Sequence, residues 1–400
     1  MMQTFQFKGK GSEYFKIWVT NIFFTVITLG LYYPWAKVKS QRYFFGNTAL
    51  SDRRFDYHAT GKQLFRSYLI ALTLLITYNI LNHFIPLASA LMGIMIAALF
   101  PWILWKSMQF RMQMTSFSQV RFAFKANLRS AYFNFLALPI LFALSFFSLP
   151  LLIGIAVGLN ESTSINSVLL ITISISLALI SVLLIVYSYS VLIKRQMIYQ
   201  INGLKFGQDA FSAILKTRVY FAILLKAIGL SFVCLVTWLV FVCLLFVIIY
   251  GFEQMTTIVH QSVSDPIALA TKFENIPLGL IIGSYIGGIT LSFVIFAFIQ
   301  TRQRNYLLNQ TRLGQTISLA STLKTRSLAW VMLSNFMIVI FTLGFGLPWA
   351  KVRTARLFAQ NTIIKGELVF DDYLSEQRDY QTSLGDQIGD VLDLDAGLII

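Results

Sequence analysis

Eight apolar runs, separated by polar and mostly basic stretches, follow one another along the chain. They cover residues 17–33, 67–85, 87–105, 131–157, 168–193, 219–250, 276–299 and 328–347. Most are close to the roughly 20 apolar residues that a helix needs to cross a bilayer. The pattern therefore predicts an all-α polytopic membrane protein with six to eight apolar segments. The sixth run, 32 residues long, is predicted to break at Gly229, because such a helix would reach about 48 Å across a hydrocarbon core of about 30 Å.

An eleven-residue motif ends the first and the last of these runs. TLGLYYPWAKV at 28–38 returns as TLGFGLPWAKV at 342–352, with eight of eleven positions identical. Gly relaxes the backbone, Pro stops a regular helix, Trp favours the membrane-water boundary, and Lys favours water and anionic headgroups. The pattern indicates an elbow at the membrane interface. Its candidate residues are Thr28, Gly30, Pro34, Trp35, Lys37, Thr342, Gly344, Pro348, Trp349 and Lys351.

Two interpretations of this elbow compete, an architectural helix end with an aromatic anchor and a ligand site. Neither copy of the motif contains an acidic residue, a His or a Cys. Aromatic residues are common at the membrane interface. The architectural interpretation is therefore favoured.

Fainter versions of the same loop occur between the two copies. Each combines a basic elbow, a short segment with alternating apolar residues, a Lys/Arg pair and a new apolar run, as after Pro101 and again near Lys194 and Arg302. This order predicts internally repeated transmembrane helix pairs, at about residues 1–86, 87–165, 166–275 and 276–365. The alternation in Phe55-Asp-Tyr57 and Phe122-Ala-Phe124 is compatible with a short strand or with an amphipathic rim. We assign it to a rim.

Positive charge predicts the orientation of these loops. The four elbow loops hold seven, five, five and five Lys and Arg residues, whereas the loops between them hold only Lys272. Cytoplasmic loops are the ones enriched in Lys and Arg. The elbow loops are therefore predicted to be basic, cytoplasmic and in contact with anionic lipid headgroups.

The first and last runs decide where the chain ends lie. If both cross the membrane, both ends are outside together with several lysines and arginines, against the charge rule. If they are re-entrant or interfacial hairpins, six spans remain and both ends are cytoplasmic. We favour the second arrangement, with Asn21 and Asn335 as candidate intramembrane polar residues midway along these runs.

Composition supports a membrane protein and excludes other classes. Hydrophobic residues make up 56% of the 400 residues and charged residues 12%, with a mean hydropathy of +0.69, whereas soluble domains carry about 25% charged residues. The net charge is +15, and the basic residues lie between the apolar runs. We therefore predict that these residues meet a membrane surface, and we expect no nucleic-acid partner. Nine of the seventeen acidic residues lie in 366–400, which predicts a separate acidic tail.

Candidate chemistry is sparse. His58, His83 and His260 lie in loops assigned to opposite sides, and the two cysteines, Cys234 and Cys243, share one apolar run. The chain has no P-loop, nucleophile elbow or dinucleotide fingerprint. We therefore expect no enzyme activity, no catalytic residues, no cofactor and no metal site.

A carrier or channel is the alternative function. Broken hydrophobic segments at corresponding positions of two repeats are typical of transporter binding sites, with Asn21 and Asn335 as pore elements. However, no Asp or Glu lies within an apolar run, so the carboxylate commonly used for proton or sodium coupling is missing.

Several short motifs of the chain form a recognisable set. They are Phe7-Lys-Gly9, Glu13-Tyr-Phe15, TLGLYYPWAKV, Arg42-Tyr-Phe44, Asn47-Thr48, Phe55-Asp-Tyr57 and Gly61. Together they resemble the YjgN family of bacterial inner-membrane proteins. The similarity covers essentially the whole chain, although Phe345-Gly-Leu347 replaces Leu31-Tyr-Tyr33 in the second copy. The resemblance implies a multi-pass protein of the bacterial cytoplasmic membrane and supplies no site residues.

Together these observations predict a non-enzymatic inner-membrane protein. Its leading predicted role is a structural or lipid-interacting membrane module. The alternative is a permease-like carrier or channel for a small solute or lipid. The sequence specifies neither a substrate nor an oligomeric state.

Overall fold

A computed structural model describes residues 2–162, 167–251 and 278–366. The described chain forms two compact units. The first contains residues 2–221, 303–323 and 335–366, and the second contains residues 222–302 and 324–334. Apart from Gly366, the predicted acidic tail lies outside the described residues.

Long apolar helices form the largest part of the described chain. They are α3 (Gly61–Phe84), α4 (Pro86–Met114), α6 (Leu138–Ser162), α7 (Ser167–Asn202), α8 (Thr217–Tyr250) and α11 (Leu278–Asn309). Within the described residues, six helical segments are long and apolar enough to cross a membrane. The prediction of a break at Gly229 is wrong, because α8 continues through this residue.

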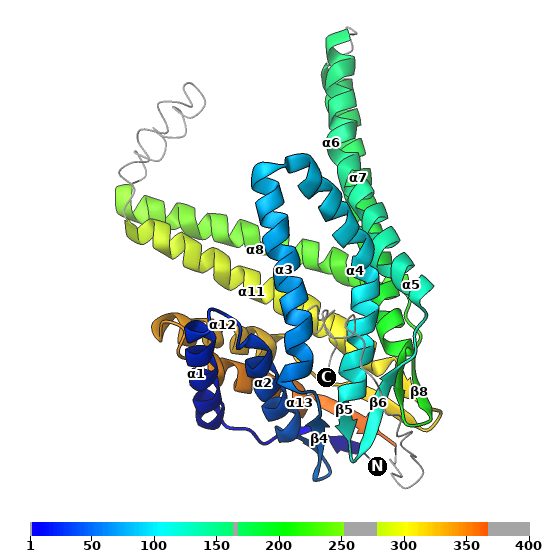
Figure 1. Cartoon of the computed structure of the whole chain (residues 1–400). Coiled ribbons are helices and arrows are strands. Elements are labelled where there is room, and N and C mark those ends of the chain that lie inside the picture. Colours follow the sequence, from blue (N-terminus) through cyan, green and yellow to red (C-terminus); the bar gives the residue numbers. More distant parts are fainter. Residues whose placement is uncertain (1, 163–166, 252–277, 367–400) are drawn as a thin grey trace. The chain divides into compact units, whose positions relative to one another are not determined.

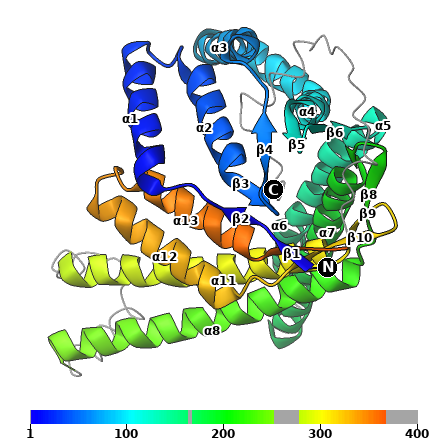
Figure 2. The same cartoon turned by 90° about the horizontal axis from the view of Figure 1, so that it is seen from below.

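Shorter elements complete the helical part. They are α1 (Gly11–Ile27), α2 (Tyr33–Asn47), α5 (Leu128–Tyr132), the π-helical turn η1 (Phe133–Ala137) before α6, α12 (Thr325–Phe341) and α13 (Leu347–Gln360). Helix α1 returns through a tight turn into α2 and contacts both α2 and α13, as Figure 2 shows. At 17 residues, α1 is shorter than the about 20 residues typical of a membrane span.

An antiparallel sheet makes the all-α prediction wrong in part. Its strands are β1 (Met2–Thr4), β2 (Gln6–Phe7), β3 (Thr48–Leu50), β4 (Arg53–Tyr57), β5 (Thr115–Phe117), β6 (Val120–Phe124), β7 (Leu204–Phe206), β8 (Asp209–Ala213), β9 (Thr311–Leu313), β10 (Ile317–Ser321) and β11 (Thr362–Lys365). Strands β4, β5 and β6 lie at one end of α3 and α4 (Figure 1). The alternating segments assigned to a rim are therefore strands.

The sheet closes on itself. Its strand order is β1-β11-β10-β9-β8-β7-β6-β5-β4-β3-β2, and its two ends, β1 and β2, are separated in the chain by Phe5 alone. The Phe5 amide donates to the Thr362 carbonyl at 3.2 Å, and the Lys8 amide donates to the Asn47 carbonyl at 2.8 Å. The N-terminal segment thus bonds to β11 on one side and to β3 on the other, which closes the sheet among the described residues.

Tight turns join several of these strand pairs. Ser51 and Asp52, and likewise Ser118 and Gln119, all have positive φ. Positive φ at both central residues defines the type I′ turn, whose twist suits a two-residue hairpin. These turns lack the Asn-Gly or Asp-Gly pairs that usually mark such hairpins, so the local sequence carried only a weak hairpin signal.

A ladder of aromatic side chains forms the core of the sheet. Phe55 is the register partner of Phe117, with ring centroids 4.5 Å apart, and Phe122 is the partner of Phe206 at 4.9 Å. Such pairs contribute about 0.5–1.5 kcal/mol each beyond their buried area. Period-two alternation directs these rings to one face of the sheet.

In the second unit, a tryptophan of α8 packs against α11. The indole nitrogen of Trp238 in α8 donates to the Ser284 carbonyl of α11 at 3.1 Å. A β-carbon on Gly287 would lie 3.2 Å from the Trp238 ring. Close packing of this Trp against a glycine is consistent with the role of small residues in pairing membrane helices.

Candidate functional site

The first TLG motif ends α1 in a left-handed cap. Leu29 and Gly30 have φ of 51° and 91°. The Gly30 amide donates to the Thr25 carbonyl at 2.7 Å, and the Thr28 hydroxyl donates to the Phe24 carbonyl at 2.6 Å. These bonds satisfy carbonyls that a helix end otherwise leaves open. Gly30 is needed here because a side chain disfavours such a φ.

The second TLG motif repeats this geometry. Leu343 and Gly344 have φ of 50° and 93°. The Gly344 amide donates to the Val339 carbonyl at 2.7 Å, and the Thr342 hydroxyl donates to the Ile338 carbonyl at 2.6 Å. The two motifs are therefore built alike although more than three hundred residues separate them.

An apolar side chain projects from each of these turns. The exposed fraction is 92% for Leu29 and 90% for Leu343. A left-handed conformation costs a non-glycine residue about 1–2 kcal/mol. An exposed leucine held at such a cost is consistent with a tip that enters lipid.

Each motif tryptophan packs on a glycine that begins another helix. A β-carbon on Gly61 would overlap the Trp35 ring, and one on Gly11 would overlap the Trp349 ring. Pro34 and Pro348, each one residue before its Trp, are buried near the starts of α2 and α13.

The same two sites share further contacts. Trp35 lies 5.0 Å from Phe65 at an interplanar angle of 43°, and Trp349 lies 4.9 Å from Phe15 at 37°. Phe65 and Phe15 each lie four residues after the packed glycine. In the same way, Arg42 donates to the Ala59 carbonyl at 2.7 Å, and Arg356 donates to the Gly9 carbonyl at 3.0 Å.

The motif lysines differ from each other. Lys37 is only 8% exposed, whereas Lys351 is exposed. The burial of Lys37 argues against contact of its side chain with headgroups, and the predicted role of both lysines at the interface stays a prediction. Lys351 retains access to a surface.

The candidate asparagines hold their helix pairs together. The Asn21 amide donates to the Ala36 carbonyl at 3.1 Å, and the Asn335 amide donates to the Ala350 carbonyl at 3.1 Å. Asn335 has two more bonds, to the Thr354 hydroxyl at 3.0 Å and from Arg353 at 3.0 Å. Both amides thus bridge a helix and its return helix, and their predicted role in a pore stays a prediction.

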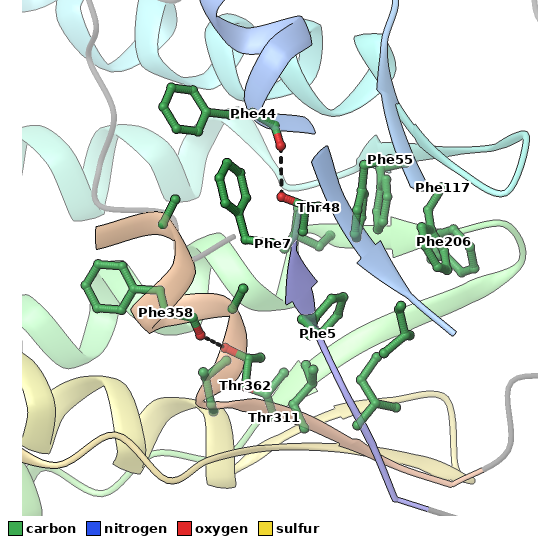
Figure 3. Close-up of a pocket in the computed structure, with 18 of the residues that line it drawn as sticks. Phe5, Phe7, Phe44, Thr48, Phe55, Phe117, Phe206, Thr311, Phe358 and Thr362 are labelled. Atoms are coloured by element: carbon green, nitrogen blue, oxygen red, sulfur yellow. Dashed lines mark hydrogen bonds between the residues drawn. The ribbon is translucent and has the colours of Figure 1, made fainter. Parts of the chain in front are cut away.

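A cavity of about 440 Å³ lies between the sheet and the ends of α2, α11 and α13. Figure 3 shows Phe44 and Phe358 on one side of it and Phe55, Phe117 and Phe206 on the other. Its size lies within the 300–1,000 Å³ typical of small-molecule sites, which are mostly apolar. Among the described residues, the lining contains Arg304 and Lys351 but no Asp or Glu. The sequence interpretation missed this cavity, because its rings come from strands and helices far apart in the sequence and the segments with Phe55 and Phe122 were assigned to a rim.

Arg304 is the buried charge at this cavity. Its side chain is 8% exposed, and its guanidinium donates to the Thr362 hydroxyl at 2.7 Å. The guanidinium carbon lies 4.7 Å from the centre of the Phe358 ring. Among the described residues, no carboxylate forms an ion pair with Arg304.

The polar cluster of the first hairpin has structural partners. The His58 ring bonds to the Ser116 hydroxyl at 2.7 Å, and Asp52 pairs with Lys8 at 3.0 Å. Burial of the ring, followed by the charge of Arg121, lowers the pKa of His58 from its ordinary 6.5. Across the described residues, no group of three His, Cys, Asp or Glu residues is placed to hold a metal ion. The expectation of no metal site stays a prediction for the whole chain.

Exposed basic side chains surround the helix starts that follow the strands. In the first unit this basic collar consists of Lys10 before α1, Lys62 and Arg66 in α3, Lys125 and Arg129 around the start of α5, and Lys216 and Arg218 around the start of α8. Lys324 and Arg326 occupy the same position at the start of α12. Cations at a helix N-terminus oppose the helix dipole at a cost of about 0.3–1 kcal/mol. Helix stability therefore does not explain the collar.

Comparison with known proteins identifies relatives along the whole chain. A family model described as "Bacterial protein of unknown function (DUF898)" matches residues 2–391. The chain belongs to this family. Inner membrane protein YjgN of Salmonella typhimurium is 28% identical over 393 residues, covering 95% of this chain and 93% of its own length. Inner membrane protein YjgN of Escherichia coli O157:H7 is 27% identical over 376 residues, covering 91% and 89%.

The family and the described helices agree on the class of protein. The resemblance to YjgN proteins is confirmed, and this DUF898 chain is a multi-pass inner-membrane protein with six apolar helical segments long enough to span. No solved structure matches it. Any molecular role must therefore be argued from the geometry of this chain.

Proposed function

We propose that the protein is a non-enzymatic, lipid-interacting structural module of the inner membrane. The closed sheet gathers the starts and ends of the membrane helices, and the basic collar binds anionic lipid headgroups. The collar is the observation that carries this proposal, because its cations are exposed at helix starts where they do not stabilise the helix. Each such cation contributes about 1 kcal/mol near an anionic membrane surface.

We further propose that the sheet and both chain ends are cytoplasmic. The pairing of β1 with β11 brings residues 2–4 and 362–365 into one sheet with the other strands. The pairs α3 and α4, α6 and α7, and α8 and α11 each leave a strand or its loop and return to the next strand. An even number of spans, with the Lys and Arg concentrated on the sheet side, agrees with the positive-inside rule.

The short helix pairs fit this orientation as re-entrant hairpins. Helices α1 and α2 enter and leave from the sheet, with the exposed Leu29 at the turn between them. The cap after α1 contributes several backbone hydrogen bonds, among them Gly30 to Thr25, which suits the interior of a membrane, where open backbone groups are costly.

Internal repetition is part of the same proposal. The equivalent contacts of Trp35 and Trp349 support it, as does the recurrence of a strand pair between helices in each of the four predicted segments. Besides these four strand pairs, β11 pairs with β1, so that residues 363–365 lie beside residues 2–4. The boundaries at 1–86, 87–165, 166–275 and 276–365 stay a prediction.

The collar is tested by neutralising four of its charges. The variant K62Q/R66Q/K125Q/R129Q and the charge-preserving control K62R/R66K/K125R/R129K are reconstituted in nanodiscs of phosphatidylcholine, with and without phosphatidylglycerol. The unfolding temperature of the wild type and of the control should rise with phosphatidylglycerol, and the rise should shrink in high salt. The neutralised variant should show a clearly smaller rise. An equal rise in all three proteins would contradict the proposal.

Sidedness is tested with one reactive cysteine. Gln119 lies in the turn between β5 and β6 and is exposed. In a chain with Cys234 and Cys243 replaced by serine, Q119C should react with a membrane-impermeant maleimide only after spheroplasts are opened. Labelling of intact spheroplasts would place the sheet outside.

A further inference from the structure

We propose that the cavity beside the sheet binds an anionic amphiphile, a single acyl chain that ends in a carboxylate or phosphate group. This inference deepens the proposed lipid-interacting function, on which it rests, and concerns a different part of the molecule from the basic collar. It commits to one ligand class, defined by an apolar body and one negative end.

The apolar body is inferred from the wall of the cavity. Phenylalanine rings from the sheet and from α2 and α13 enclose a volume of about 440 Å³. The ring of Phe5, from the segment that closes the sheet, also contributes to this wall. Each CH₂ group of a hydrocarbon chain buried against such a wall favours binding. A wall of this kind suits an acyl chain better than a hydrated metabolite.

The negative end is inferred from Arg304. A buried charge with no opposite charge is costly, and proteins normally pair such a group. The Nε atom of Arg304 has no hydrogen-bond partner among the described residues, and only the Thr362 hydroxyl accepts from its Nη2. The planar guanidinium offers donors arranged to match a carboxylate or phosphate. An anion at this position would satisfy both the charge and the open donor.

Charge complementarity also excludes a cationic ligand. Lys351 is the second charged residue of the lining, and it is exposed. The described lining residues include two cations and no acid, so the cavity favours an anion. The remaining polar side chains of the cavity are neutral.

Two further residues allow the charge and the volume to be tested separately. Arg312 in β9 is an exposed arginine outside the lining and serves as the matched control for Arg304. Ala355 in α13 is one of the lining residues and has a small side chain. The substitution A355F therefore fills part of the volume and leaves Arg304 in place.

Binding is measured by native mass spectrometry of the full-length protein after detergent delipidation. The probes are palmitate, palmitoyl-lysophosphatidylglycerol, monopalmitoylglycerol and inorganic phosphate. One equivalent of a charged amphiphile should bind, and palmitate against the lysophospholipid distinguishes a free fatty acid from a lipid headgroup as the source of the anion. Monopalmitoylglycerol and inorganic phosphate should bind far more weakly, because each lacks one half of the ligand.

The variants separate the cavity from the collar. R304Q should weaken binding of the charged probe by about ten- to a hundredfold, the range expected for a lost hydrogen bond to a charged group. A355F should also weaken binding, whereas R304K should retain part of it and R312Q should bind like the wild type. The collar variant K62Q/R66Q/K125Q/R129Q should keep the single bound amphiphile even if it loses its response to phosphatidylglycerol.

Three results would overturn the inference. Equal binding of monopalmitoylglycerol would show that the charge is not recognised. Unchanged binding in both R304Q and A355F would place the amphiphile elsewhere. A gain in probe binding after deletion of residues 367–400 would identify the acidic tail as the occupant in place of a lipid.

Discussion

The two PWAKV sites use the same contacts but different covalent connections. At the first, Trp35 packs on Gly61 a short distance along the same stretch of chain. At the second, Trp349 packs on Gly11, which lies at the opposite end of the sequence. The comparison shows that the two chain ends together build one more copy of the site. Only non-covalent contacts hold that copy closed.

The difference has an energetic consequence. When the first site opens, its helices stay tethered through β3 and β4. When the second opens, β1 and β2 can leave the sheet and expose two edges, because nothing in the described residues links them covalently to β11. Free sheet edges invite pairing with other chains. The second site should therefore be the weaker of the two under stress.

The largest expected effect comes from removing the closing segment. Deletion of residues 2–7 removes β1, Phe5 and β2, and with them the buried Phe7 ring stacked 5.7 Å from Phe44. Loss of a buried Phe alone typically costs about 3–5 kcal/mol. The unfolding temperature in detergent should fall strongly and oligomers should appear in size-exclusion chromatography. Q6A, which alters an exposed side chain but keeps the strand, should behave like the wild type; a deletion with wild-type stability would show that closure does not matter.

A smaller effect is expected from adding one methyl group at each packed glycine. G61A and G11A place a β-carbon against Trp35 and Trp349, and such overpacking costs about 1–3 kcal/mol. G11A should also raise protease sensitivity at the N-terminus, because its site has no covalent tether. Gly46 in α2 is the control, since a β-carbon there meets nothing within 4 Å. G46A should leave stability unchanged or raise it slightly, and equal stability of all three variants would refute the packing role of the glycines.

The smallest effects are expected at the two asparagines. The Asn335 side chain has three hydrogen-bond partners. The Asn21 side-chain nitrogen has one, and its side-chain oxygen Oδ1 is buried without a partner among the described residues. N335A should therefore destabilise more than N21A, by a difference of about 0.5–1.5 kcal/mol. N79A, at an exposed asparagine of α3, should cost less than either. The opposite order of N335A and N21A in thermal unfolding would contradict this account of the two helix pairs.

Much of the helical part could be predicted from the sequence. Apolar length identified the long helices, and the duplicated Thr-Leu-Gly motif identified two equivalent helix ends, where Gly30 and Gly344 adopt positive φ. The error at Gly229 arose because length alone was used to place a break, although a helix can tilt or extend beyond the hydrocarbon core.

The sheet could not be predicted as easily, for two physical reasons. Its strands have two to five residues, too few for a clear period-two pattern, and its Ser-Asp and Ser-Gln turns lack the usual glycine. One signal was available: Phe5-Gln-Phe7 precedes Gly11 much as Phe55-Asp-Tyr57 precedes Gly61. That similarity indicates a strand at the N-terminus. It does not reveal that β11, from the other end of the chain, is its partner.

The cavity depends on this long-range pairing. Arg304 and Phe358 are brought together with Phe5 only when α11, α13 and the N-terminal segment meet. In the sequence, Arg304 is one of several arginines after an apolar run. Its burial follows from tertiary packing alone.

The most direct test of the central claim is a disulfide across the closing strands. Thr4 and Ile363 are register partners in β1 and β11. In a chain with Cys234 and Cys243 replaced by serine, T4C/I363C should form an intramolecular bridge when isolated membranes are oxidised, while T4C paired with a cysteine at the exposed Gln119 should not. Protease cleavage within a loop should then leave the two fragments joined until reduction. Fragments that separate without reduction, or a bridge only between different chains, would contradict a sheet closed by the two ends of one chain.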